Sequence, residues 1–317
     1  MKEDPGLTYA RGQEALGRLE ERMRVSPVRA AFRVRAQIAE RQALAAIDVA
    51  PLSDHDIEVD GRRVVKTSVF DLSIGRRLVG TAISLDAMTG DAAAVLDWLG
   101  VDGGAADFGD RVARVESWQR AIEGWRTSPP LTGGAHLGAS WRLHAPLGQS
   151  DLAASVLIGD RWGPGRWDGS QGGLVAMGLD RQQSGWRVAR GEELEALWLD
   201  AIRSGAGMLL DMEQRLRGFA GRARHFLESR RRPGRLGELL HLAMVRPYVT
   251  SAMAARQLGL TSAGAIKLLT IASDAGLLVE RTGQASYRHY SIPVAPPSEV
   301  PRKSDNPFEL SEPMAWD

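Results

Sequence analysis

The sequence of 317 residues contains no cysteine. Disulfide bridges, zinc sites built from thiolates and cysteine nucleophiles are therefore excluded, and a reducing compartment is favoured. No apolar run approaches the ~20 residues that a bilayer-spanning helix needs. The opening "MKEDPGLTYARG" also lacks the hydrophobic stretch of a signal peptide. We therefore expect a cytoplasmic protein with no membrane partner.

Motifs of catalysis and metal binding are equally scarce. None of the six histidines belongs to an H-x-x-x-H or H-E-x-x-H pair, the spacings that place metal ligands on one helix face. The glycine-rich stretch 159–173, "GDRWGPGRWDGSQGG", lacks the G-x-x-x-x-G-K-[ST] phosphate loop, and G-x-S-x-G is absent. The acidic stretch 53–60, "SDHDIEVD", fits a cation site less well than a solvated face. We expect no metal, no cofactor and no catalytic residue.

The formal net charge is only +1, but the charge is unevenly distributed. Residues 215–292 carry thirteen Arg or Lys against four acids, whereas residues 293–317 carry two basic and five acidic residues. A basic segment of domain size is typical of nucleic-acid binding, because neutralising phosphates releases condensed counterions. We therefore expect this part of the chain to meet double-stranded DNA.

Apolar spacing predicts a mainly α-helical fold. We expect a helical domain over residues 1–200, a basic helical connector over 201–232, a winged helix-turn-helix over 233–292, and a disordered, proline-rich acidic tail over 293–317. The stretch 215–235, "RLRGFAGRARHFLESRRRPGR", holds eight arginines against one acid. It fits either a solvated helix face with a linker or an auxiliary clamp on the DNA backbone.

Several local features are predicted within the first half of the chain. Residues 7–50 fit two helices separated at Ser26-Pro27, with the serine as N-cap and the proline at the first helical position. Residues 51–65 fit either a small hairpin around Asp-Gly or a helix start. Helical patterning then resumes over residues 67–100 and again over 112–125.

The next stretches differ in glycine content. Residues 127–185 are rich in Gly, Pro and Trp, which predicts long loops between short helices. Residues 192–229 fit one long helix, or two helices with a kink at 204–207.

The most informative stretch is "AARQLGLTSAGAIKLL" (254–269), where one helix stops and another starts almost at once. An amphipathic helix over 235–245 precedes it and ends before Pro247. Thr250 or Ser251 then caps a second helix. This order of elements is typical of a helix-turn-helix, which brings one helix across another so that its outer face can enter a major groove.

The turn and the following hairpin complete the pattern. Gly259 tolerates the positive φ of a tight turn, Thr261 caps the third helix and Gly276 ends it. The stretch "LLVERTGQASYRHYSI" then predicts two short strands around Thr282-Gly283, forming a wing. The predicted DNA-binding residues on these elements are Arg256, Thr261, Ser262, Ile266, Lys267, Thr270, Arg281, Gln284, Tyr287 and Arg288.

Two families resemble parts of this sequence. "LWLDAI", "RLGELLHLAMVRPYVTSAMAARQLGLTSAGAIKLL" and "DAGLLVERTGQASYRHYSI" resemble the C-terminal part of bacterial Fic proteins that carry a winged helix. Most of the chain from about Ala30 also resembles an uncharacterised bacterial family of DNA-binding proteins with a helical N-terminal domain and a C-terminal helix-turn-helix. The resemblance implies DNA binding and a helical domain that is a degenerate version of the Fic fold.

The Fic resemblance also bears on catalysis. Fic enzymes use a loop of the form H-x-F-x-(D/E)-G-N-G-R, and the nearest match here is "HAPLGQSDL", residues 144–152. Only His144 is kept, since Ser150 stands where the asparagine would be and Leu152 where the arginine would be. We therefore do not expect an enzyme.

The predicted function is DNA binding, with transcriptional regulation by a homodimer as the first hypothesis. The alternatives are a Fic-like AMP transferase with an atypical active site, and a plasmid-maintenance or protein-interaction factor.

Overall fold

The computed structural model describes residues 4–47, 57–60, 63–67, 83–148, 151–166, 173–179, 183–283 and 288–293. This part of the chain is mainly helical, and its strands form two small two-stranded sheets. The fold class expected from apolar spacing is thus confirmed. None of the described helices is both long and apolar enough to cross a membrane.

Two helices open the chain, as predicted, but the second begins at Arg29 and not at the predicted Pro27. Helix α1 spans Pro5–Val25 and helix α2 spans Arg29–Ile47. Ser26 lies between them, and its Oγ accepts a hydrogen bond from the Val28 N–H at 3.2 Å. The same hydroxyl donates to the Glu213 carboxylate at 2.7 Å. The corner between α1 and α2 is therefore fixed by a buried contact from a distant helix.

A hairpin follows, and it resolves the alternative that the sequence left open. Strand β1, Ile57–Asp60, pairs antiparallel with strand β2, Arg63–Thr67. The predicted helical stretch at residues 68–80 lies outside the described residues.

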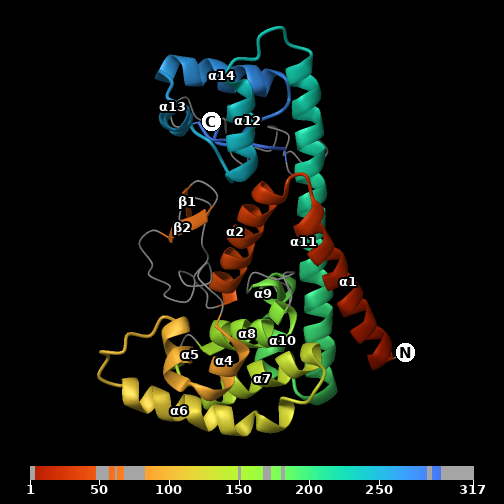
Figure 1. Cartoon of the computed structure of the whole chain (residues 1–317), viewed down its shortest axis with the longest axis vertical. Coiled ribbons are helices and arrows are strands. Elements are labelled where there is room, and N and C mark those ends of the chain that lie inside the picture. Colours follow the sequence, from red (N-terminus) through yellow and green to blue (C-terminus); the bar gives the residue numbers. More distant parts are fainter. Residues whose placement is uncertain are drawn as a thin grey trace, which may run out of the picture.

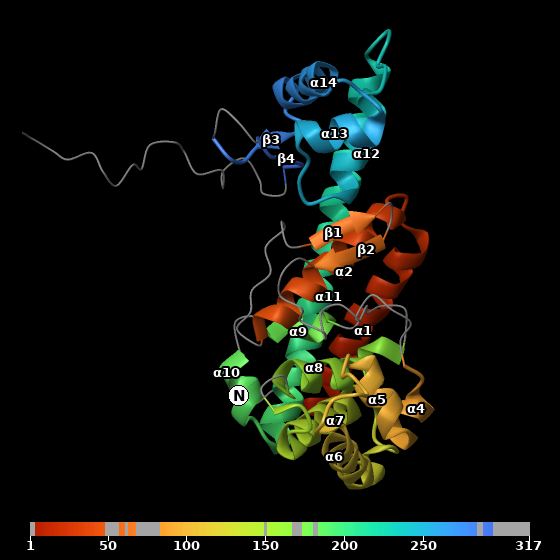
Figure 2. The same ribbon diagram turned by 90° about the vertical axis from the view of Figure 1, so that its left-hand side faces the viewer.

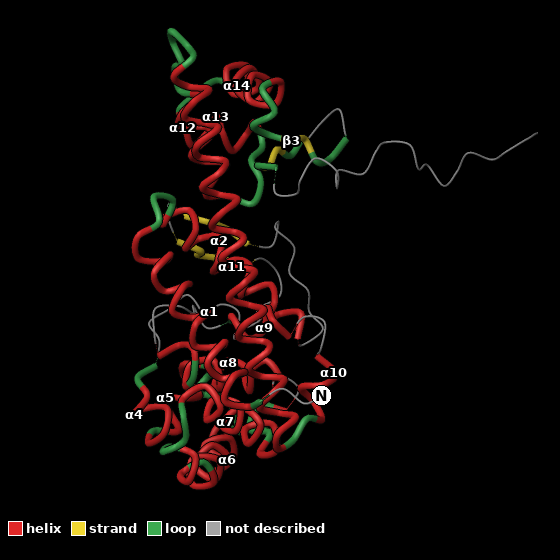
Figure 3. Tube along the Cα trace, turned by 90° about the vertical axis from the view of Figure 1, so that its right-hand side faces the viewer, coloured by secondary structure: helices red, strands yellow, loops and turns green. Residues whose placement is uncertain are grey.

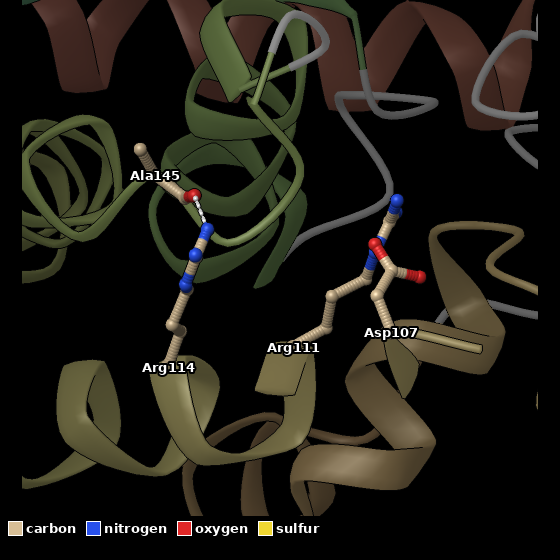
Figure 4. A network of polar contacts seen from close by, with 4 residues as sticks. All are labelled: Asp107, Arg111, Arg114 and Ala145. Atoms are coloured by element: carbon tan, nitrogen blue, oxygen red, sulfur yellow. Dashed lines mark hydrogen bonds and ion pairs between the residues drawn. The ribbon is translucent and has the colours of Figure 1, made fainter. Parts of the chain in front are cut away.

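Short helices then lead to the middle of the chain. They are α4 (Leu85–Gly90), α5 (Ala92–Trp98), α6 (Phe108–Ala121) and the 3₁₀ turn η2 (Glu123–Trp125). At the start of α6, Arg111 pairs with Asp107 at 2.8 Å, and Arg114 donates to the Ala145 carbonyl at 3.3 Å (Figure 4). The hydrogen bond from Arg114 holds α6 against Ala145, which directly follows the helix that ends at His144.

The prediction of long loops over residues 127–185 is wrong where the structure describes this stretch. It contains helices α7 (Pro130–His144) and α8 (Asp151–Trp162), the turn η4 (Pro164–Arg166) and the short helices α9 (Leu174–Leu179) and α10 (Gln183–Val188).

Two glycines in this stretch, Gly134 and Gly138, lie where α7 and α8 touch. A Cβ on Gly134 would lie 2.5 Å from the Gly159 carbonyl oxygen, and one on Gly138 would lie 2.5 Å from the Ser155 carbonyl oxygen. The two backbones therefore approach more closely than any side chain would allow. These glycines serve helix packing and not turns.

Helix α11, Gly191–Glu228, is the longest described element, with 38 residues. At 1.5 Å per residue it is about 57 Å long, and it runs along the whole molecule in Figure 1. The structure shows the single helix and not the kinked pair considered from the sequence. The predicted domain boundary at residue 200 lies within it, and the division into domains remains a prediction.

The core joins the two ends of the chain. One apolar cluster extends from Leu16 in α1 to Ile292 near the end of the described residues. Its largest buried side chains include four tryptophans. Trp118 and Trp141 meet edge to face with ring centroids 5.1 Å apart, and Trp186 and Trp198 lie 4.9 Å apart. The Trp186 and Trp198 rings lie beside Gly138 and Gly159 of the α7–α8 contact.

Candidate nucleic-acid interface

Three short helices form the C-terminal end of the molecule: α12 (Leu236–Val245), α13 (Ser251–Leu258) and α14 (Ser262–Asp274). Their bounds match the predicted ones closely. Helix α12 ends where Arg246 adopts an extended backbone, as expected for a residue that precedes Pro247. Figures 1 and 2 show α12 and α13 on one side of α14, with the opposite side of α14 turned away from the molecule.

Three local features define the start of α13 and the turn that connects it to α14. The Thr250 hydroxyl caps α13 by accepting from the Met253 N–H at 3.1 Å. Gly259 ends α13 with φ of 59°, in the left-handed region that glycine adopts most easily. The Thr261 hydroxyl then caps α14 by accepting from the Gly264 N–H at 3.2 Å. The predicted stop, turn and restart are therefore confirmed.

The two faces of α14 differ sharply. Ala265, Leu269 and Ala272 are fully buried and pack into the core. On the other face Ile266 is 53% exposed, and Lys267 beside it is exposed as well. The remaining predicted residues on this helix, Thr261, Ser262 and Thr270, are also exposed. The structure thus brings all five α14 candidates to one accessible surface.

A small sheet lies beside these helices. Strand β3, Val279–Glu280, pairs antiparallel with strand β4, Tyr290–Ser291. Val249, between α12 and α13, forms a bridge to Tyr290, with N–H to carbonyl distances of 2.7 and 2.9 Å. The chain before α13 is therefore hydrogen-bonded to β4, which fixes the hairpin relative to the helices.

The start of the connection between β3 and β4 is held by Glu280. Its carboxylate accepts from the Thr282 hydroxyl at 2.7 Å and from the Gly283 N–H at 2.8 Å. The Thr282 hydrogen bond, with smaller help from the Gly283 N–H and the positive charge of Arg288, lowers the pKa of Glu280 below its ordinary value. Gly283 has φ of 60°, so the predicted glycine tip does adopt a conformation that favours glycine.

The other predicted DNA-binding residues lie in different surroundings. Arg256 is exposed on α13, and Arg288 is exposed just before β4. Arg281 donates through Nε to the Ser291 Oγ at 3.0 Å. Part of its guanidinium is therefore hydrogen-bonded to strand β4. Gln284 and Tyr287 lie outside the described residues.

Residues far away in the sequence anchor this end of the molecule. Arg35 on α2 donates to the carbonyl oxygens of Ala243 and Met244 at 3.0 and 3.1 Å. These carbonyls belong to the last turn of α12, where a cation is favoured by the helix dipole. Val245 packs beside them against an apolar patch of α2 formed by Ala31, Val34 and Ile38. Sequence reasoning missed this contact, since nothing near Arg35 distinguishes it from other exposed-looking arginines.

Comparison with known families agrees with this geometry. Residues 236–292 match a family described as "HTH DNA binding domain". The match covers all three helices and both strands described above. No match to the chain was found among curated proteins. The chain thus carries a C-terminal helix-turn-helix DNA-binding domain. This makes it a DNA-binding protein.

The segment that was compared with the Fic loop begins at the end of α7, at the opposite end of the molecule from α14 (Figure 1). His144 is the last residue of α7, and its Nδ1 lies 2.8 Å from the Ser140 carbonyl oxygen. Ala145 follows with φ of 43°, so the chain turns sharply after the histidine. Ser150 lies outside the described residues. Within the described ranges, no three His, Cys, Asp or Glu side chains are grouped so that they could hold a metal ion.

Proposed function

We propose that the chain is a transcriptional regulator that binds duplex DNA through a winged helix-turn-helix, with α14 as the recognition helix. The observation that carries the proposal is the asymmetry of α14. Ala265, Leu269 and Ala272 anchor one face in the core, while Ile266 and Lys267 are exposed on the other. A helix held in this way can enter a major groove without losing its own packing.

The hairpin supports the winged form of this fold. The bridge from Val249 to Tyr290 places β4 beside the segment that precedes α13, and β3 pairs with β4 on its other edge. Helices and strands thus follow the order helix, short strand, helix, helix, hairpin. In this proposal Arg288 and the residues around the hairpin tip meet the DNA beside the groove that α14 enters.

The composition of α14 limits how the sequence of the DNA is recognised. Lys267 is the only Lys or Arg within Ser262–Asp274. Thr261, Ser262 and Thr270 offer short hydroxyls that can bond to several bases, and Ile266 offers an apolar contact for a thymine methyl. We therefore expect phosphate contacts and DNA shape to contribute much of the selectivity.

A homodimer is part of the proposal. One recognition helix with a single cation reads few bases, and two copies on adjacent half-sites double the number of base contacts. Analytical ultracentrifugation of the full chain is expected to show a dimer at micromolar concentration. A monomer throughout that range would contradict the proposed homodimer but not the proposed DNA binding.

We propose binding and not catalysis as the activity. Of the Fic-type loop, residues 144–152 keep only the histidine, so the groups that would bind nucleotide phosphates are not present in that motif. Incubation with labelled ATP is expected to give no transfer. Transfer that disappears in His144→Ala would establish an AMP transferase instead.

The direct test of the proposed function is selection of bound fragments from genomic DNA of the host, followed by a gel shift with random duplex at low salt. We expect enrichment of a defined site and a weaker shift with the random duplex. A protein that meets DNA only through partners would give neither result.

A further inference from the structure

A second concentration of positive charge lies at the same end of the molecule as α14. From residue 222 to residue 235 the chain carries six arginines and one acid, Glu228. All six arginines are exposed. Four of them, Arg230, Arg231, Arg232 and Arg235, lie in the short segment 229–235 that joins α11 to α12, and we name this segment the arginine loop.

The arginine loop is tied to the helix-turn-helix. Arg235 donates from Nη1 to the Leu258 carbonyl oxygen at 2.6 Å. Leu258 is the last residue of α13 and directly precedes the turn at Gly259. Arg235 also pairs with Glu238 in the first turn of α12 at 3.3 Å. The end of the loop is therefore fixed against the turn that leads into the recognition helix.

The beginning of the loop is restrained as well. The Arg230 guanidinium lies over the Phe226 ring at 4.9 Å from its centroid. The Ser229 hydroxyl donates to the Phe226 carbonyl oxygen at 2.8 Å. Gly234 takes φ of 56°, which lets the chain reverse its direction before α12. The loop is thus a shaped element that presents Arg230, Arg231 and Arg232, and it is not a bare linker between two helices.

The position of the loop relative to α14 decides what its arginines can meet. Figures 1, 2 and 3 show the loop projecting beyond α14 at the same end of the molecule, beside the end of α11. Helices α12 and α13 lie below α14 in Figures 1 and 2. A duplex resting on the exposed face of α14 would therefore have its backbone alongside the loop.

We propose that Arg230, Arg231 and Arg232 hold the phosphate backbone of the same duplex that α14 enters, as a clamp that acts on any sequence. This inference rests on the proposed function. A guanidinium is always charged and its planar fork of donors matches phosphate oxygens, so it suits backbone contacts that need no base recognition. The clamp adds affinity and register to what the single cation of α14 supplies.

The composition of the loop favours DNA over an anionic membrane surface. Segments that bind membranes usually combine basic residues with large apolar side chains that enter the lipid. Residues 229–235 are "SRRRPGR", without such a side chain. Phe226, the nearest aromatic residue, is only half-exposed and lies beneath Arg230. The composition of the arginine loop therefore matches a row of DNA phosphates better than a membrane surface.

The test is the salt dependence of binding by the full chain to a fluorescent duplex of random sequence, measured by anisotropy. The substitution is Arg230→Gln with Arg231→Gln and Arg232→Gln. The matched control replaces three exposed arginines that lie outside both the arginine loop and the helix-turn-helix, Arg18, Arg120 and Arg126, also by glutamine. Both variants lose three charges, so they separate a local contact from a general effect of net charge.

We expect the loop variant to lower the slope of log affinity against log salt by about 2 to 3 units, at about 0.9 unit per phosphate contact. The control is expected to keep the wild-type slope. Replacing the same three loop residues by lysine is expected to restore most of the slope, because charge and not shape drives counterion release. If the triple glutamine variant melts below the assay temperature, the single substitution Arg231→Gln is tested instead. It is expected to lower the slope of log affinity against log salt by about 1 unit.

The outcomes separate this inference from the proposed function. If the wild-type chain does not bind DNA even at low salt, the proposed function fails and the clamp fails with it. If the wild type binds and the loop variant keeps the full slope, only the clamp is overturned. Vesicles of phosphatidylcholine with phosphatidylserine provide a further arm. Vesicle binding that is lost in the loop variant, with an unchanged DNA slope, would assign the loop to a membrane and overturn the inference.

Discussion

Replacing Gly205 by alanine tests the close contact between α11 and α9. Gly205 is buried in the middle of α11, and a Cβ at this position would overlap the carbonyl oxygen of Leu174. That carbonyl belongs to the first turn of α9, whose residues Leu174, Val175 and Ala176 are fully buried. The backbone of α9 therefore has nowhere to move without disturbing the core.

The expected magnitude follows from two opposing effects. In an exposed helix, alanine stabilises by about 1 kcal/mol relative to glycine, because glycine loses more backbone entropy. Overpacking in a core typically costs about 1–3 kcal/mol, and here the overlap involves backbone and not the end of a flexible side chain. We expect Gly205→Ala to lower the free energy of unfolding by about 2 kcal/mol.

Urea denaturation followed by far-UV circular dichroism measures this change. Gly207→Ala is the matched control, since it lies two residues along the same helix and a Cβ there would meet nothing within 4 Å. The control is expected to raise the free energy of unfolding by about 1 kcal/mol. If Gly205→Ala is as stable as the wild type, or if both variants shift in the same direction, the reasoning about the contact is refuted.

Three further predictions concern the DNA-binding end. Lys267→Ala combined with Arg288→Ala is expected to weaken DNA binding and to flatten the salt slope by about 1 to 2 units; an unchanged slope in anisotropy titrations would mean that these residues do not contact phosphates. Gly259→Ala is expected to cost about 1 kcal/mol of stability in urea, because its φ of 59° is unfavourable for a residue with a Cβ; equal stability would show that the turn rearranges without cost. Arg35→Met is expected to lower the free energy of unfolding by about 2 kcal/mol, because it removes hydrogen bonds from a charged group to the end of α12. Arg33→Met, on the exposed side of the same helix, is its control, and equal effects of the two substitutions would argue against the anchor.

The helix-turn-helix could be predicted from the sequence because its signals are local. Thr250, Gly259 and Thr261 act within three or four residues of their own positions, by capping an N–H or by adopting a positive φ. Such effects depend little on the rest of the molecule. The bounds of α12, α13 and α14 and the exposure of the α14 candidates followed from these residues and from the apolar spacing between them.

The glycines of residues 127–185 could not be interpreted in the same way. A glycine in a turn and a glycine at a helix crossing have the same local sequence signal, and the difference is what lies opposite. Gly134 and Gly138 face the backbone of α8, so they belong to helices, although their number suggested loops. Arg35 is a similar case, because its partners at Ala243 and Met244 are more than two hundred residues away.

The sequence by itself therefore determined the helical class of the protein, the three helices of its DNA-binding end and the side of α14 that faces outward, since caps, turns and apolar spacing act over a few residues. Only the tertiary structure decided how the glycine-rich stretch packs, what anchors α12 to the helical part, and that the arginine loop lies against the turn beside α14. The reason is that each of these depends on contacts between segments that are distant in the chain, and their formation is governed by the shape and charge of the partner surface.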